Sequence, residues 1–211
     1  MEALIKTHVY VDGFNLYYGA VKDTPYRWLD IRKMCELLLP GRDIVRIKYF
    51  TAHISARPND PGQPTRQQVY LRALRTTPEL EVILGSFLTF ERIMPLGGQP
   101  ANRQKFVRVI RTEEKGSDVN LATHLLIDGF KGDYRQAVLV TNDSDLLEPI
   151  RFVRSDLKLQ VGLLNPQKHP SRVLLPHVDF VKQIRKGVLK SSQFPLEMQD
   201  QKGTFRRPQG W

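Results

Sequence analysis

The segment at residues 138–150 constrains the fold more than any other part of the chain. It opens with an apolar run over 138–140, which suits a strand buried in a parallel sheet. Small polar residues follow, and apolar residues then resume at helical spacing. Two carboxylates, Asp143 and Asp145, stand at this junction. Ligands of parallel α/β sheets bind beyond the carboxyl ends of the strands, and adjacent anions repel unless a positive charge lies between them. The junction is therefore a candidate site for a divalent cation.

A helix cap explains either carboxylate without any ligand. Asp145 and Glu148 have the spacing of a capping box, and Asp143 could cap its own turn. This segment alone leaves both interpretations open. Further carboxylates at the same edge of the sheet would favour the cation site.

The chain alternates between strand and helix patterns. This alternation predicts an α/β fold with a mostly parallel, five-stranded sheet covered on both faces. The expected strands lie at residues 7–11, 44–52, 80–85, 138–140 and 159–163. The expected helices include residues 29–38, 66–76 and 118–127.

Two regions depart from this alternation. Residues 87–112 contain two alternating segments around a loop rich in Gly and Pro, which predicts an inserted β-hairpin. Residues 178–189 are predicted to be helical. The polar and basic segment 191–211 either wraps the domain, contacts nucleic acid or a second subunit, or is disordered.

Two more aspartates fall at equivalent positions of the predicted sheet. Asp12 ends the first strand, and Asp118 lies in the first turn of the helix after the hairpin. Right-handed crossovers bring strand C-termini and helix N-termini to one edge, so these two are expected beside Asp143 and Asp145. Oxygen ligands without a Cys or His cluster favour Mg²⁺ or Mn²⁺ over Zn²⁺. The five histidines show no metal-ligand spacing, and core or surface roles are expected for them. For Asp118 alone, stabilisation by the helix dipole is an equally good explanation.

The charge balance fits a polyanionic partner. Lys and Arg number 32 against 22 Asp and Glu, a formal net charge of +10. If the carboxylates converge in one cleft, such an excess suits holding phosphates against metal ions. The single cysteine, Cys35, excludes an internal disulfide framework and fits a reducing cytosol. No signal peptide or membrane span is expected, so the prediction is a cytoplasmic protein.

Three short motifs resemble the signatures of NYN domains, which are relatives of the PIN-like nucleases. They are Val-Asp-Gly-Phe-Asn at 11–15, Lys-Gly-Ser-Asp-Val at 115–119 and Thr-Asn-Asp-Ser-Asp-Leu at 141–146. Their order is that of the family, and the LabA-like branch is the most similar. The resemblance implies a Rossmann-like three-layer domain over residues 1–165, followed by a partly helical, basic extension at 166–211.

The same resemblance implies divalent-metal-dependent cleavage of RNA. It assigns Asp12, Asp118, Asp143 and Asp145 to the catalytic, metal-binding set and Asn15 to the role of their polar companion. One position departs from the pattern, because Asn142 stands where many PIN-like proteins have Gly. The geometry of that loop is therefore open.

Three basic residues are candidates for contacts with RNA. Lys115 lies beside the predicted acidic edge, Arg66 opens the helix after a Pro-rich loop, and Arg108 lies in the basic second half of the hairpin. Solvated surface charge is the alternative for each of them.

Three functions stay open at this point. The first is a metal-dependent ribonuclease, and the second is a non-catalytic RNA-binding or adaptor protein that keeps the fold. The third is a phosphatase or nucleotide hydrolase, which would need an Asp-x-Asp on the first strand. Asp12 is instead followed by Gly13 and Phe14. A homodimer is possible under each of these functions.

Overall fold

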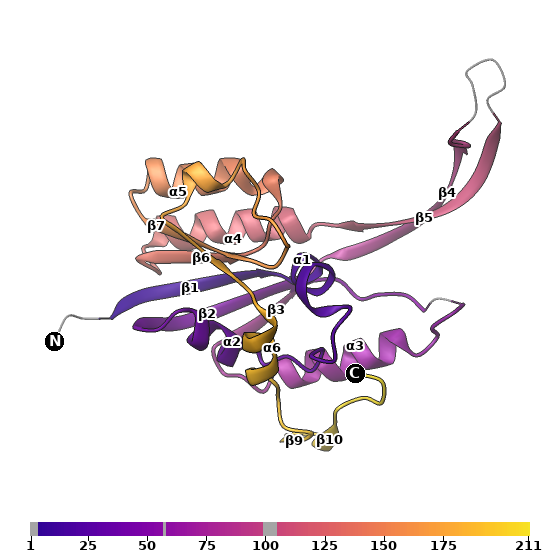
Figure 1. Ribbon diagram of the computed structural model, residues 1–211, viewed down its shortest axis with the longest axis horizontal. Coiled ribbons are helices and arrows are strands. Elements are labelled where there is room, and N and C mark those ends of the chain that lie inside the picture. Colours follow the sequence, from indigo (N-terminus) through magenta and orange to yellow (C-terminus); the bar gives the residue numbers. More distant parts are fainter. Residues whose placement is uncertain (1–3, 57, 99–104) are drawn as a thin grey trace.

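The computed structural model describes residues 4–56, 58–98 and 105–211, and a parallel sheet forms its centre (Figure 1). The sheet has six strands in the order β3-β2-β1-β6-β7-β8, and all neighbouring strands are parallel. These strands are β1 (Ile5–Asp12), β2 (Arg42–Thr51), β3 (Leu80–Leu84), β6 (Gln136–Val140), β7 (Gln160–Asn165) and β8 (Phe180–Gln183). The α/β class and the parallel sheet predicted from the sequence are confirmed.

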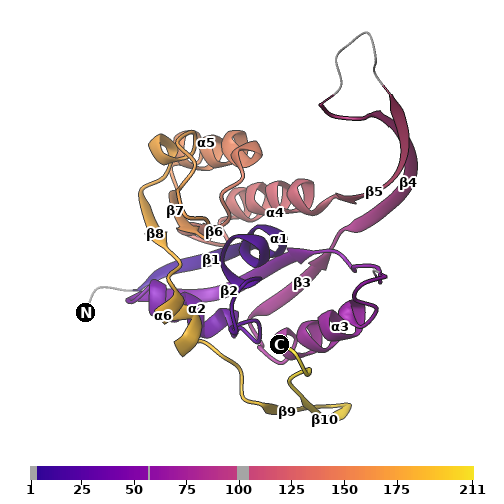
Figure 2. The ribbon, with the colours of Figure 1, turned by 45° about the vertical axis from the view of Figure 1, so that its right-hand side comes forward.

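Helices cover both faces of the sheet and give three layers (Figure 2). One face carries α4 (Ser117–Lys131) and α5 (Leu147–Ser155). The other face carries α1 (Gly13–Leu16), a π-helical turn (Tyr17–Val21), α2 (Ile31–Leu38), α3 (Gln63–Leu74) and α6 (Lys186–Ser191). Successive strand residues point to opposite faces, so the β1 residues Val9 and Val11 enter one core and Tyr10 the other. Within the described part of the chain, no helix is both long and apolar enough to cross a bilayer.

The sixth strand corrects two expectations, a sheet of five strands and a helix over 178–189. Residues Phe180–Gln183 pair with β7 as a parallel strand, and only Lys186–Ser191 is helical. The strand is four residues long, so it shows too little periodicity to be distinguished from a helix. Gly162 on β7 gives room for the Phe180 ring, because a Cβ there would lie 2.1 Å from that ring.

The predicted hairpin is present and extends away from the sheet (Figure 1). It consists of β4 (Ser86–Pro95) and β5 (Phe106–Lys115), which are antiparallel. At its base the Phe87 ring meets the Phe14 ring edge to face, 5.6 Å between centroids. The tip at 99–104, which includes the basic Arg103, lies outside the described residues.

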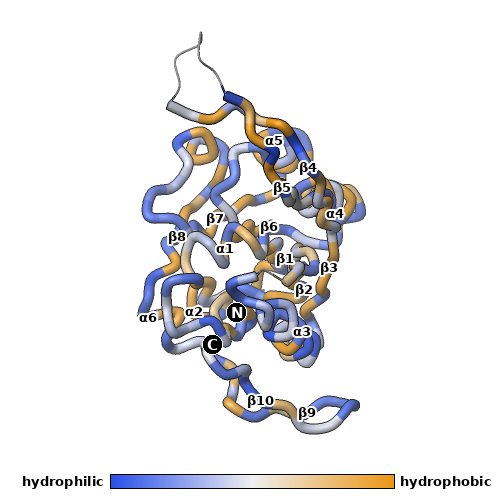
Figure 3. Tube along the Cα trace, turned by 90° about the vertical axis from the view of Figure 1, so that its right-hand side faces the viewer, coloured by the Kyte–Doolittle hydropathy of each residue, from blue (hydrophilic) through white to orange (hydrophobic). Residues whose placement is uncertain are grey.

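The last segment wraps the domain, which was one of the alternatives left open by the sequence. Its hairpin of β9 (Glu197–Asp200) and β10 (Gly203–Arg206) lies below α3 in the view of Figure 3. Arg72 of α3 donates to the Asp200 carboxylate at 2.7 and 2.8 Å and lies over the Phe205 ring. Further along the tail, the centroids of the Trp211 and Tyr70 rings lie 5.2 Å apart.

Candidate metal centre

The candidate site lies where the strand order reverses. Strands β1 and β6 are neighbours at the centre of the sheet, and the chain leaves them toward opposite edges. Asp12 is the last residue of β1, and Asp143 follows three residues after the end of β6. The crevice beyond such a reversal is where open parallel sheets bind ligands. Asp118, in the first turn of α4, reaches the same place.

Three carboxylates converge at this edge and are called the acidic cluster below. Asp12, Asp118 and Asp143 each offer an oxygen that lies within 4.8 Å of those of the other two. Asp12 is buried, Asp143 is half-buried and Asp118 is exposed, so the cluster opens to solvent on one side. The set consists only of hard oxygen donors, which fits Mg²⁺ or Mn²⁺.

The environment of Asp12 makes its negative charge unfavourable without a cation. The pKa of this carboxyl is raised to about 6, mainly by burial and in addition by the nearby charges of Asp118 and Asp143. Two hydrogen bonds act in the opposite direction. The Asn15 amide donates to Oδ1 at 2.9 Å, and the Thr141 hydroxyl donates to Oδ2 at 3.1 Å. A divalent cation would remove the repulsion, which is a second respect in which these residues fit a metal.

Asn15 ties the two acidic loops together. Its side-chain oxygen accepts a hydrogen bond from the backbone amide of Asn142 at 3.1 Å, and its own backbone amide donates to the Asp12 carboxylate. Asn142 in turn accepts from the Ser171 amide at 2.6 Å and donates to the His169 carbonyl at 3.1 Å. Within the described residues, positive φ outside glycine occurs only at Lys158. Asn142 thus has an ordinary backbone conformation, which settles the loop geometry that the sequence left open.

Asp143 and Asp145, the two aspartates after β6, differ in their positions. Asp143 accepts from the Asp145 amide at 3.0 Å and caps the 3-10 turn Ser144–Leu146, so it serves as a cap while belonging to the cluster. Asp145 is exposed and is not one of the three clustered carboxylates. The capping box suggested for Asp145 and Glu148 is wrong, because α5 has Leu146 at its N-cap and no side-chain cap.

The basic candidates lie in three different settings. Arg66 is paired with Asp60 at 2.6 Å and lines a pocket beside α1. Lys115 ends β5, one residue before the N-cap of α4. Arg108 is 71% exposed on the projecting hairpin and pairs with Glu91 at 3.2 Å.

A second polar cluster was missed from the sequence and is called the buried polar cluster below. Asp128 of α4 accepts from Lys48 at 2.7 Å and from the Tyr10 hydroxyl at 2.7 Å, and His8 lies 3.4 Å away. Burial opposes ionisation, but the hydrogen bonds from His8, Lys48 and Tyr10 hold the pKa of Asp128 well below its usual range. Lys48 also contacts the His124 ring at 3.1 Å. His8 and His124 thus have core roles, as expected.

The fold and the acidic cluster together define an α/β domain with a candidate metal centre at the reversal point of its parallel sheet. A family model, the NYN domain, matches residues 6–180, and the chain belongs to that family. The narrower assignment to the LabA-like branch stays a prediction.

Two further similarities extend over most of the chain. The 6-hydroxy-3-succinoylpyridine 3-monooxygenase HspA of Pseudomonas putida is 29% identical over 98% of this chain and 75% of its own length. A crystal structure of a Vibrio parahaemolyticus protein of unknown function superimposes with a TM-score of 0.57 at 19% identity. That comparison covers 88% of this chain and 96% of the other, and it supports the fold alone.

Proposed function

We propose that this protein is a divalent-metal-dependent ribonuclease that hydrolyses RNA phosphodiester bonds at the acidic cluster. The observation that carries the proposal is the convergence of Asp12, Asp118 and Asp143 from three distant segments at the reversal point of the sheet. Anionic side chains gathered in this way, in a protein of net charge +10, fit a cation-dependent site for a polyanion.

In this proposal the three carboxylates hold Mg²⁺ or Mn²⁺. The bound cation would supply an activated water and neutralise charge that develops on the phosphate. Thr141 and Asn15 keep the Asp12 carboxylate oriented toward the cluster. Asp145 contributes negative potential from beside the cluster.

The basic residues and the setting of the protein belong to the same proposal. Lys115 and Arg66 would contact phosphates near the cluster, and Arg108 would contact RNA that follows the hairpin. A cytoplasmic location is consistent with Cys35, a fully buried thiol whose pKa is raised to about 12 by burial. Homodimer formation stays part of the proposal as an option, because β4 and β5 form a two-stranded ribbon separate from the main sheet.

The test is cleavage of single-stranded and structured RNA in Mg²⁺ or Mn²⁺. We expect Asp12→Asn and Asp143→Asn each to lower the rate by at least about a hundredfold, since even changes to residues around a metal's ligands cost about 10–100-fold. Asp156→Asn is the matched control, because this carboxylate is exposed at the C-terminal end of α5, whereas Asp143 precedes the N-terminal end of that helix. Full activity of the Asp12→Asn/Asp143→Asn double variant would overturn the proposal.

Two other functions make different predictions. A non-catalytic RNA-binding or adaptor protein would bind RNA in a salt-sensitive manner and cleave none with any metal. A monooxygenase acting on a small hydroxypyridine is favoured by the name of the Pseudomonas relative and by an aromatic pocket beside the cluster. It would consume oxygen when given such a ring and an electron donor, and would leave RNA intact.

A further inference from the structure

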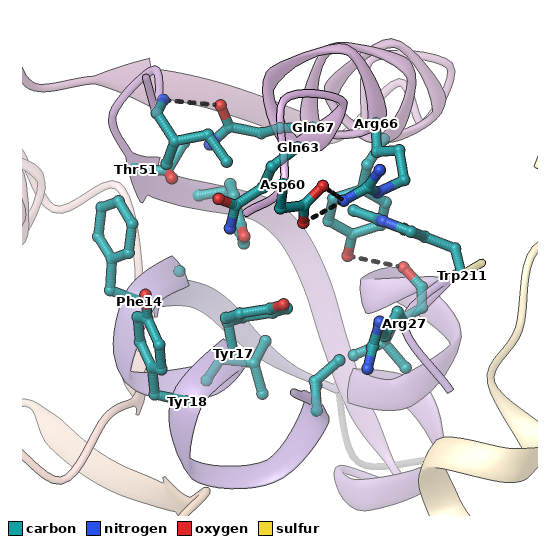
Figure 4. Close-up of a pocket in the computed structure, with 17 residues that line it drawn as sticks. Phe14, Tyr17, Tyr18, Arg27, Thr51, Asp60, Gln63, Arg66, Gln67 and Trp211 are labelled. Carbon is teal, nitrogen blue, oxygen red and sulfur yellow. Dashed lines mark hydrogen bonds and ion pairs between the residues drawn. The ribbon is translucent and has the colours of Figure 1, made fainter. Parts of the chain in front are cut away.

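A pocket of about 110 Å³ lies on the side of α1, and Figure 4 shows the residues that line it. Gly13 and Phe14, which line it, directly follow Asp12 in the chain. Thr51, another lining residue, follows Phe50, the residue paired with Asp12 across the sheet. A ligand in this pocket would therefore lie next to a phosphate held at the cluster.

The walls of the pocket are mainly aromatic. The rings that line it are Phe14, Tyr17, Tyr18, Tyr49, Tyr70 and Trp211. They come from three parts of the structure: the turn after β1, the β2–α3 region and the wrapping tail. Flat rings of this kind stack on the faces of nucleobases with little regard to sequence.

Polar groups complement these walls. Figure 4 shows the Gln63 side chain inside the pocket, and a carboxamide can both donate to and accept from the edge of a base. The Arg66 guanidinium lines the same pocket as an ion pair with Asp60, whose carboxylate is also part of the lining. Arg27 is held by the Lys22 and Gly210 carbonyls at 2.9 and 3.3 Å. Apolar walls with a few placed polar groups are typical of a ligand site.

The connection between the pocket and the cluster is closely packed. A Cβ at Gly13 would lie 2.7 Å from the Phe50 carbonyl oxygen and 2.7 Å from Tyr49, so α1 packs directly on β2. Gly13 is the single residue between Asp12 of the cluster and Phe14 of the pocket wall.

We propose that this pocket binds one unstacked nucleobase of the RNA, next to the phosphate at the acidic cluster. This inference rests on the proposed ribonuclease function and adds a single-stranded substrate with a base splayed out beside the cut. The volume suits one flat ring system, since pockets for drug-sized ligands measure about 300–1,000 Å³. The two arginines that line the pocket, Arg27 and Arg66, suit the phosphate attached to such a base.

The test measures RNA binding by the Asp143→Asn protein, so that cleavage does not interfere. The probes are one short single-stranded RNA and a series of versions that each lack a single base. We expect the RNA that lacks the base at one position to bind with a Kd about tenfold higher than that of the complete RNA, which corresponds to the loss of one stacked base. This increase in Kd is called the penalty below. Tyr18→Ala and Gln63→Leu should reduce that penalty to under about threefold. Both positions are accessible, with Tyr18 50% exposed and Gln63 half-buried, so these variants should fold. Phe130→Ala, an exposed aromatic outside the pocket, is the control and should leave the penalty unchanged.

Each outcome decides one question. Equal Kd for all base-lacking RNAs, or a penalty that persists in both pocket variants, overturns the inference. Saturable binding of 6-hydroxypyridine-3-carboxylic acid at the pocket, without any base-dependent RNA binding, also overturns it and assigns the pocket to a small free ring. If the wild-type protein cleaves RNA but shows no penalty, only this inference fails. A base-dependent penalty without cleavage by the wild-type protein supports the pocket and defeats the ribonuclease proposal.

Discussion

The same strand and helix contribute to two polar clusters in which a buried carboxylate has opposite surroundings. At one end, Asp12 of β1 and Asp118 of α4 meet in the acidic cluster. Further back, Tyr10 of β1 and Asp128 of α4 meet in the buried polar cluster. The two positions on α4 are ten residues apart, which is about 15 Å along the helix.

The difference lies in what surrounds each negative charge. Asp128 has an ammonium group and a phenol within hydrogen-bond distance, and its pKa is lowered. Asp12 has two neutral donors and two more carboxylates, and its pKa is raised to about 6. A buried carboxylate that is paired with a cation holds the layers of the fold together. Carboxylates that are gathered in one place are instead arranged to bind a cation from solution.

The largest expected effect comes from breaking the buried polar cluster. Lys48→Met removes the cation from a pair whose side chains are 10% and 8% exposed. We expect the free energy of unfolding to fall by about 3–5 kcal/mol, the usual result of leaving one buried charge unpaired. Chemical denaturation measures this change, and Arg108→Met at an exposed pair should stay within about 1 kcal/mol. A loss below about 1 kcal/mol for Lys48→Met would show that the two regions do not differ as described.

The next effect is stabilisation of the acidic cluster by metal. Mn²⁺ at a hundred times its Kd should stabilise the wild-type protein by about 2.7 kcal/mol, and a thermal melt would follow this as a rise in Tm. Asp143→Asn should abolish the rise. Lys48→Met should lower Tm but keep the rise, because it leaves the cluster intact. An equal metal response in wild-type and Asp143→Asn proteins would contradict this.

A smaller effect of opposite sign is expected for Asp12→Asn without metal. The pKa of Asp12 is higher in the folded state than the ordinary 3.8, so its contribution to stability is lost as pH rises through about 6. At pH 7 the variant should therefore be more stable than wild type by about 1–3 kcal/mol, and at pH 4 nearly equal to it. Asp128 behaves in the reverse way, since its lowered pKa gives stability that is lost as pH falls below about 4. Unfolding curves at pH 7 and pH 4 measure the effect of Asp12, and further curves below pH 4 measure that of Asp128. A less stable Asp12→Asn protein at pH 7 would refute the argument.

The smallest effect is expected at Asp145. This carboxylate is exposed and lies outside the cluster. Asp145→Asn should therefore change the cleavage rate by less than about fivefold, which corresponds to the about 1 kcal/mol that an exposed charge contributes at most. Parallel rate measurements with Asp143→Asn make the comparison. Equal losses in the two variants would place Asp145 among the metal ligands, as the family resemblance implies.

The acidic cluster could be predicted from the sequence because its members occupy positions set by chain direction. Asp12 ends a strand and Asp118 begins a helix, and parallel topology brings such ends to one edge. The buried polar cluster could not be predicted in this way. Lys48 alternates with apolar neighbours and looks like a solvent-facing residue, but the sheet is covered on both faces and the side chain is buried. Its partner, Asp128, lies 80 residues away, and no local pattern connects the two.

The pocket lining and strand β8 were missed for related reasons. Trp211 joins Tyr70 through a tail whose path depends on contacts such as that between Arg72 and Asp200. Those contacts follow no period that a single sequence reveals. The Phe180 ring of β8 occupies the space left by Gly162, which is a property of the neighbouring strand.

The burial of Asp12 among like charges also has an evolutionary consequence. Because this residue opposes folding when no cation is present, a lineage that replaced it would gain stability rather than lose it. Selection on folding alone would therefore not preserve a carboxylate at this position, and only a function at the acidic cluster would preserve it.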